Sequence, residues 1–89
     1  MAWRIVYLPA AERDLAGLDA ETRRRVLKFI DQRIASLENP RLIGEPLHGR
    51  TLGNFWKYRV GDYRIICDIQ DKEVRVVVVK IGNRREVYR

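Results

Sequence analysis

The segment FWKYRVGDYRIICDI, residues 55–69, decides the fold of this 89-residue chain. Apolar and polar side chains alternate on both sides of Gly61-Asp62, and that dipeptide is typical of a two-residue hairpin turn. A turn there places Arg59 directly opposite Arg64 on neighbouring antiparallel strands. We therefore predict a β-hairpin whose register is fixed by its turn.

The alternation assigns the side chains of this hairpin to two faces of a sheet. One face is apolar and is predicted to form the core: Trp56, Tyr58, Val60, Tyr63, Ile65, Cys67 and Ile69. The other face carries Lys57, Arg59 and Arg64, with no acidic residue in register with them in the predicted hairpin. Like charges that face each other cost up to about 1 kcal/mol. The three cations are either simply solvated or, because they converge, form an anion-binding surface.

The N-terminal half predicts one strand followed by two helices. WRIVYL, residues 3–8, is rich in aromatic and β-branched residues, and Pro9 then suits the first turn of a short helix that ends near Gly17. Asp19 is a favourable N-cap for a second helix, which Asn39-Pro40 ends. Its apolar stripe recurs at helical spacing: Val26, Phe29, Ile30, Ile34 and Leu37.

The C-terminal half predicts a loop and a final strand around the hairpin. Residues 38–54 hold two prolines and three glycines and are predicted to form a loop. After a turn at QDKE, the β-branched residues 74–81 form the last strand, in which Arg75 is expected to face Asp68 as an ion pair. The order strand, two helices, three strands predicts an α+β domain, with a helical hairpin packed on a small, mostly antiparallel sheet.

Composition restricts the class of protein. Residues 1–89 are expected to form a single domain, and the net charge of +6 favours a polyanionic partner, either nucleic acid or an acidic protein. The single cysteine, Cys67, excludes an internal disulfide and is expected to be a buried thiol. The carboxylates are scattered and His48 is the only histidine, so no metal site is predicted. Without a secretion signal or a long apolar segment, a cytoplasmic, non-membrane protein is expected.

Two stretches, PLHGRTLGNFWKYRVGDYRIICDI and VVVVKIGNRREVYR, make the chain similar to the RelE branch of the RelE/ParE toxin superfamily of type II toxin–antitoxin systems. The resemblance implies the compact toxin fold that is related to small microbial ribonucleases. It implies a ribosome-dependent mRNA endoribonuclease that cuts in the A site and works without a cofactor. It also implies an acidic, partly disordered RelB-like antitoxin, through which alone operator DNA would be bound.

The same resemblance implies a role for individual residues. Arg64 would contact the scissile phosphate, Arg84 would protonate the leaving group, and Tyr88 would orient the attacking nucleotide and stack on its base. Lys57 and Arg59 match the basic pair on the preceding strand. The RNA-binding set implied is Lys57, Arg59, Arg64, Arg85 and Arg89. Asn83 stands where many relatives have histidine, and Gly82-Asn83 is expected to turn the chain so that the terminal residues reach the basic face.

The residue types fit such chemistry. Cleaving RNA through its own 2′-hydroxyl requires a proton acceptor, stabilisation of a dianionic phosphorane and protonation of the 5′-oxygen. Arginine clamps phosphate and keeps its charge, and Lys57 among arginines is a candidate base. With no acidic or imidazole machinery predicted, the intrinsic rate should be low, which agrees with dependence on the ribosome for orientation.

Two alternatives share this fold. One is a ParE-like inhibitor of DNA gyrase without nuclease activity, and the other is a non-catalytic protein that binds its antitoxin and co-represses the operon. A gyrase inhibitor does not need Arg64, Arg84 and Tyr88 as a catalytic set, so their presence together favours the nuclease.

Overall fold

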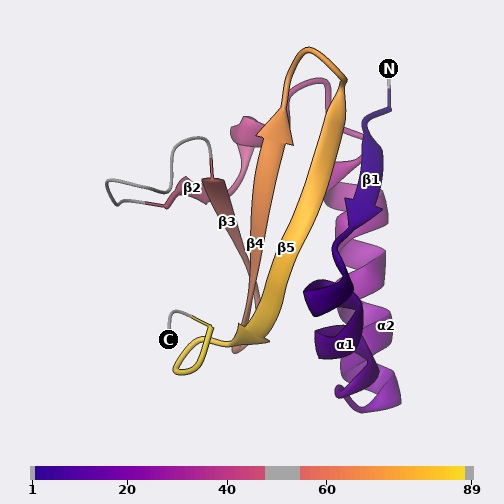
Figure 1. The fold of residues 1–89 in the computed structure, drawn as a ribbon, viewed down its shortest axis with the longest axis vertical. Coiled ribbons are helices and arrows are strands. Elements are labelled where there is room, and N and C mark those ends of the chain that lie inside the picture. The colour runs from indigo at the N-terminus through magenta and orange to yellow at the C-terminus, as the bar shows by residue number, and fades with distance from the viewer. Residues whose placement is uncertain (1, 48–54, 88–89) are drawn as a thin grey trace.

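The structure, a computed structural model, describes residues 2–47 and 55–87 (Figure 1). Within these residues the helices are α1 (Pro9–Ala16) and α2 (Ala20–Phe29), followed by a π-helical turn, η1 (Ile30–Ile34), and a short 3₁₀ helix, η2 (Pro40–Leu42). The strands are β1 (Arg4–Tyr7), β2 (Glu45–Pro46), β3 (Phe55–Val60), β4 (Tyr63–Gln70) and β5 (Arg75–Asn83). The α+β class predicted from the sequence is confirmed.

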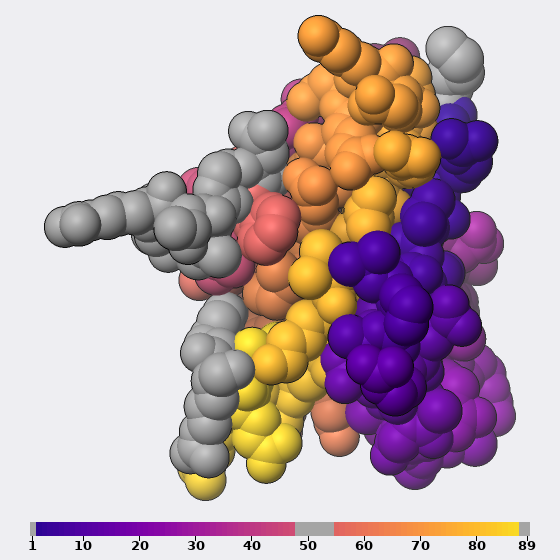
Figure 2. Space-filling view, viewed as in Figure 1, coloured from indigo at the N-terminus to yellow at the C-terminus, as the bar shows by residue number. Residues whose placement is uncertain are grey.

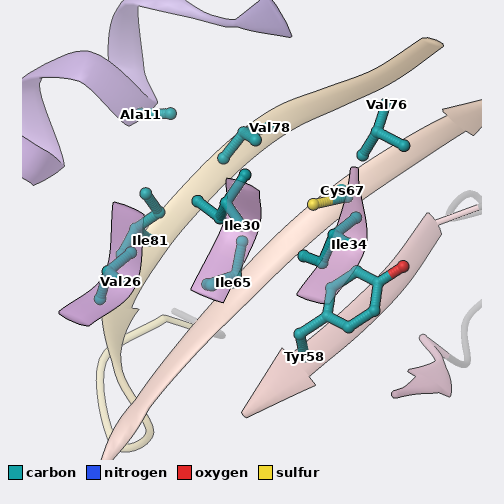
Figure 3. Close-up of a cluster of buried hydrophobic side chains, with 10 residues drawn as sticks. All are labelled: Ala11, Val26, Ile30, Ile34, Tyr58, Ile65, Cys67, Val76, Val78 and Ile81. Carbon is teal, nitrogen blue, oxygen red and sulfur yellow. The ribbon is translucent and has the colours of Figure 1, made fainter. Parts of the chain in front are cut away.

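The strands form one mixed sheet in the order β1-β5-β4-β3-β2. β1 is parallel to β5, and the remaining neighbours are antiparallel. Figure 1 shows α1 and α2 together on one side of this sheet. The core lies between the helices and the face they cover, where side chains from both layers meet (Figure 3): Ala11, Val26, Ile30, Ile34, Tyr58, Ile65, Cys67, Val76, Val78 and Ile81. Burial of these apolar side chains is the main force that holds the two layers together.

The β3–β4 hairpin has the predicted register. Arg59 faces Arg64 across the strands, and Gly61 in the turn adopts a φ of +58°, a conformation that glycine tolerates at no steric cost. Of the side chains assigned to the apolar face, Tyr58, Ile65, Cys67 and Ile69 are buried; Trp56 and Val60 are partly buried and pack against the core. Tyr63, the remaining member of the predicted set, is only half-buried and lies outside the core cluster. Alternation therefore assigned this core face correctly except at Tyr63.

The predicted helix signals also hold at both N-termini. Pro9 begins α1, and the carboxylate of Asp19 caps α2 by accepting a hydrogen bond from the Thr22 N–H at 3.1 Å. The α-helix ends at Phe29, where the chain widens into the π turn, in which the Ala35 N–H bonds to the Ile30 carbonyl at 2.9 Å. The apolar stripe continues through this turn with the buried Ile34.

The segment before the hairpin is more ordered than predicted. Instead of a plain loop, its described part contains η2 and the two-residue strand β2, which pairs with β3. Gly44 makes this contact possible: at a φ of +79° it lies so close to β3 that an added Cβ would come within 2.5 Å of the Lys57 carbonyl oxygen. The indole N–H of Trp56 fixes the segment by donating to the Ile43 carbonyl at 2.7 Å.

The predicted pairing of the last strand with β4 is wrong, because the strand is shifted along β4 from the expected register. The turn runs through Val74, which has a φ of +48°, and Arg75 consequently pairs with Gln70 rather than facing Asp68. The Arg75 guanidinium donates from Nε to the Gln70 side-chain oxygen at 2.7 Å. β5 also continues through Asn83 because β4 still offers pairing partners there, so the chain does not turn at Gly82-Asn83 as expected.

No helix in the described part of the chain is long and apolar enough to cross a membrane.

Candidate functional site

Three predicted site residues, Lys57, Arg59 and Arg64, line one cavity of about 480 Å³ at the outer edge of β3. The other side chains and backbone that line it come from α2, η1 and the segment before the hairpin: Phe29, Arg33, Ile43, Gly44, Glu45 and Tyr58. β2 is too short to cover the whole of β3, which leaves the hairpin end of this edge open to the cavity. The hairpin register thus brings together cations that alternation alone placed on one face.

The Arg59–Arg64 pair remains without a neutralising carboxylate in residues 2–47 and 55–87. The Arg64 guanidinium folds toward the hairpin turn, where Nη1 donates to the Gly61 carbonyl at 3.2 Å and to the Tyr63 carbonyl at 3.1 Å. Carbonyl acceptors orient the guanidinium without cancelling its charge. The arrangement therefore holds a full positive charge in place, which is what a phosphate-binding group requires.

Lys57 does have an acidic neighbour, contrary to the expectation from sequence. β2 pairs Glu45 with Lys57, and the Lys57 Nζ lies 3.7 Å from the Glu45 Oε2. The Glu45 side chain is 74% exposed, and such exposed ion pairs contribute at most about 1 kcal/mol. Glu45 is a site residue that the sequence did not reveal, because a two-residue strand that includes a proline gives no alternation to detect.

The residues after β5 fold back toward the hairpin turn. The backbone N–H of Arg84 donates to the Asp62 carbonyl at 2.9 Å, and the Asn83 side-chain oxygen accepts from the Arg85 N–H at 3.0 Å. Val87 is buried, and an added Cβ at Gly82 would lie 3.4 Å from the Val87 Cβ. This turn lies beside the β3–β4 turn at the lower end of the sheet in Figure 1, and the yellow residues of Figure 2 gather there.

Arg84 and Arg85 are exposed on this turn and do not line the cavity that holds Arg64. The predicted site is thus divided between a cavity at β3 and a neighbouring basic turn. Asn83 has a structural role in the turn, since its side chain caps the first residues that follow β5. Tyr88 and Arg89 lie outside the described residues, as does His48.

Two buried titratable groups are held in their neutral forms. Burial raises the pKa of the Cys67 thiol, and burial likewise raises the pKa of the Tyr58 phenol, whose hydroxyl donates to the Pro40 carbonyl at 2.7 Å. Cys67 is therefore the buried, unreactive thiol predicted from its strand. No group of three His, Cys, Asp or Glu side chains suited to a metal ion occurs in the described ranges.

The fold and the sequence together define the family of proteins to which this chain belongs. A family model described as the ParE toxin of type II toxin–antitoxin systems, parDE, matches residues 5–88. The chain belongs to the RelE/ParE family of type II toxins.

Particular relatives come from Mycobacterium tuberculosis. The toxin RelG is 28% identical over 89 residues, covering 100% of this chain and 99% of RelG. The toxin RelE is 30% identical over 87 residues, covering 98% of this chain and 87% of RelE.

Solved structures agree with the fold. The toxin–antitoxin complex RelBE2 of Mycobacterium tuberculosis contains a chain with a TM-score of 0.84 and 26% identity, with 97% of this chain and 95% of that chain covered. The isolated E. coli RelE toxin has a TM-score of 0.73 and 22% identity, with 98% and 92% covered. The second likeness concerns the fold alone.

Proposed function

We propose that this type II toxin is an endoribonuclease that cleaves mRNA in the ribosomal A site, without a metal ion, and so inhibits translation in the cytoplasm. The observation that carries the proposal is the Arg59–Arg64 pair, held face to face beside Lys57 in one open cavity. A fold without a polyanionic ligand gains nothing from facing arginines, because their repulsion destabilises the sheet. A phosphate group between them would convert that repulsion into attraction.

The chemistry assigns one task to each group. Arg64 and Arg59 bind the scissile phosphate and stabilise the charge that develops on it, and charge stabilisation of this kind is often the largest catalytic contribution. Arg84 protonates the 5′-oxygen as the phosphorus–oxygen bond breaks. Tyr88 stacks on a base and orients the attacking nucleotide.

The proton of the attacking 2′-hydroxyl needs an acceptor. In the described cavity the Glu45 carboxylate, 3.7 Å from the Lys57 Nζ, can take it, and Lys57 can take it only after it has given up its own proton. When the 2′-oxygen attacks, its proton passes to this acceptor, the new phosphorus–oxygen bond closes a 2′,3′-cyclic phosphate, and the 5′-oxygen leaves.

The basic residues are divided between the cavity at β3 and the turn after β5, and this separation supports the proposal that mRNA cleavage depends on the ribosome. Arg84 lies on a turn that is held by backbone bonds to Asp62 and Asn83, outside the cavity of Arg64. An mRNA held in the correct conformation by another molecule can contact both places at once. Orientation of this kind contributes about 7–11 kcal/mol to catalysis.

The partner that neutralises the toxin is proposed to be a RelB-like antitoxin. A solved structure whose chain matches this one with a TM-score of 0.84 is described as a RelBE2 toxin–antitoxin complex. With a net charge of +6 on this chain, an acidic segment that orders on binding would complement its surface. Such a segment would compete with RNA for the same basic residues: Lys57, Arg59, Arg64, Arg85 and Arg89. Operator DNA would be bound through the antitoxin.

Cleavage in a cell-free translation system tests the proposal. Arg64→Ala and Arg84→Ala should each reduce mRNA cleavage at least about 100-fold, since each removes a charge aimed at the reacting phosphate or leaving group. Arg13→Ala, which removes an exposed cation from α1, is the matched control and should cleave like the wild type. Mapped 5′ ends should fall in phase with codons. Full cleavage by both site variants would contradict the assignment.

A second candidate function has one observation in its favour, because the matching family model is described by its ParE members. Under that reading the chain inhibits DNA gyrase, and the cations contact the enzyme or its DNA. A supercoiling assay separates the two: trapped gyrase–DNA breaks with no cut mRNA would replace the nuclease proposal. Absence of any growth arrest on expression would favour a non-catalytic, antitoxin-binding co-repressor.

A further inference from the structure

Arg33 enters the same cavity from the helical layer, on the other side of the open edge of β3. It belongs to η1, and it lines the cavity together with Phe29 from the end of α2. π-helical turns are rare and frequently occur at functional sites, because the wider turn redirects a side chain that a regular helix would place elsewhere. The turn here keeps Ile30 and Ile34 buried while Arg33 remains exposed.

The charge of Arg33 is not neutralised by any carboxylate in the part of the chain that the structure describes. Among the described residues that line the cavity Arg33 is the fourth cation, and since these residues include one carboxylate, that of Glu45, together they carry a net charge of +3. Arg59 and Arg64 reach the cavity from the sheet, and Arg33 reaches it from the helix. A polyanion that crosses the edge of β3 would meet cations on both sides.

The cavity also offers an apolar surface next to Arg33. Phe29 is half-buried, and its ring meets that of the buried Tyr58 edge to face, with centroids 6.2 Å apart and an interplanar angle of 61°. This contact fixes the orientation of the Phe29 ring. Ile43 adds a second apolar group to the lining. Aromatic and arginine side chains placed together are the usual components of single-stranded RNA recognition.

We propose that Arg33, with Phe29 and Ile43, forms a subsite for a nucleotide of single-stranded RNA next to the scissile phosphate. Arg33 binds the phosphate of that nucleotide, and its base lies against the apolar lining. The RNA backbone then crosses the open edge of β3 from Arg33 to the Arg59–Arg64 pair. This inference rests on the proposed nuclease function and gives Arg33 a substrate-positioning role.

Binding of uncleavable RNA tests the subsite directly. We would measure the affinity of the purified chain for 2′-O-methyl oligonucleotides of two and of eight nucleotides over a range of salt concentrations. Arg33→Gln should weaken binding of the octanucleotide about fivefold or more and lower the salt slope by about 0.7, the value for one phosphate contact on a single strand. Binding of the dinucleotide should change less, since it is too short to span both sides.

Matched variants isolate the role of Arg33. Arg33→Lys keeps the charge and should retain the salt slope. Arg13→Gln removes one exposed cation from α1 and should leave both measurements nearly unchanged. On programmed ribosomes, Arg33→Gln should raise KM and leave kcat unchanged, which a merely structural residue would not do.

The outcomes separate this inference from the proposal it rests on. If the wild type cleaves mRNA but Arg33→Gln behaves like Arg13→Gln, the subsite is wrong and the nuclease stands. If the wild type neither binds the oligonucleotides nor cuts mRNA, the nuclease proposal fails and the subsite fails with it.

Discussion

The two faces of the β3–β4 hairpin have the same backbone and opposite chemistry. On the face toward the helices, Tyr58 and Ile65 are almost fully buried, and the hydroxyl of Tyr58 has a partner. On the other face Ile66 is buried too, but Arg59 and Arg64 face each other without a carboxylate in the described residues. One face is arranged for stability, and the other keeps a repulsion that lowers stability. The difference indicates that function, rather than folding, accounts for the cations.

The largest expected difference is in the free energy of unfolding, when residues next to each other on opposite faces of the hairpin are each replaced by alanine. Ile65→Ala should lower the free energy of unfolding by about 2–5 kcal/mol, because it leaves a cavity in the core between helices and sheet. Arg64→Ala, one residue earlier, should change it by less than about 1 kcal/mol and in the stabilising direction, since the repulsion with Arg59 disappears. Urea denaturation of both variants provides the measurement. Equal losses at the two positions would show that the faces do not differ as described.

A smaller effect is expected from the buried phenol that anchors the segment before the hairpin. Tyr58→Phe removes the donor to the Pro40 carbonyl and should cost about 1–3 kcal/mol, since the carbonyl loses its partner in a buried place. Thermal unfolding of this variant would measure the loss. Tyr63→Phe, on a half-buried tyrosine with no side-chain hydrogen bond in the described part of the chain, is the control and should unfold like the wild type. A loss for the control as large as for Tyr58→Phe would argue against this hydrogen bond.

The smallest effect concerns an exposed ion pair and its pH dependence. The Arg41 guanidinium donates to both oxygens of Asp71, at 2.8 and 2.9 Å, and these hydrogen bonds lower the pKa of the Asp71 carboxyl. A carboxyl with a lowered pKa in the folded state stabilises the fold above its unfolded pKa, about 3.9, and loses that contribution as pH falls through the folded value. Asp71→Asn should therefore flatten the acid side of the stability curve slightly. An unchanged curve below about pH 4 would mean that the pair contributes nothing.

Much of the fold was predictable because its signals are local. The Gly61-Asp62 turn fixed the hairpin register, and Asp19 capped its helix as expected. The strand β2 was not predictable, because its pairing depends on how closely Gly44 approaches β3, which is a tertiary contact. The predicted register between β4 and β5 was wrong because Val74 lies in the turn, although a valine normally avoids a positive φ. It is held there by two hydrogen bonds: its N–H donates to the Asp71 carbonyl, and its carbonyl accepts from the Arg4 N–H.

The candidate site was predictable to a similar degree. Alternation placed Lys57, Arg59 and Arg64 on one face, and the structure brings them to one cavity. Sequence could not show Glu45 or Arg33, since each reaches the cavity from a segment whose position depends on the whole fold. The roles of Arg84, Arg85 and Tyr88 stay predictions.

The parallel pairing of β1 with β5 has a consequence for how the protein is made. Arg4 lies beside Arg75, so the first strand finds its partner only after most of the chain has been synthesised. Closing so long a loop costs entropy before any contact compensates it, and such non-local pairing slows folding. Helices and hairpin can form early, but the sheet stays incomplete until residues 75–83 are in place. A cell that makes this toxin therefore has an interval in each round of synthesis, before residues 75–83 have been made, in which the first strand exists and its partner in the sheet does not.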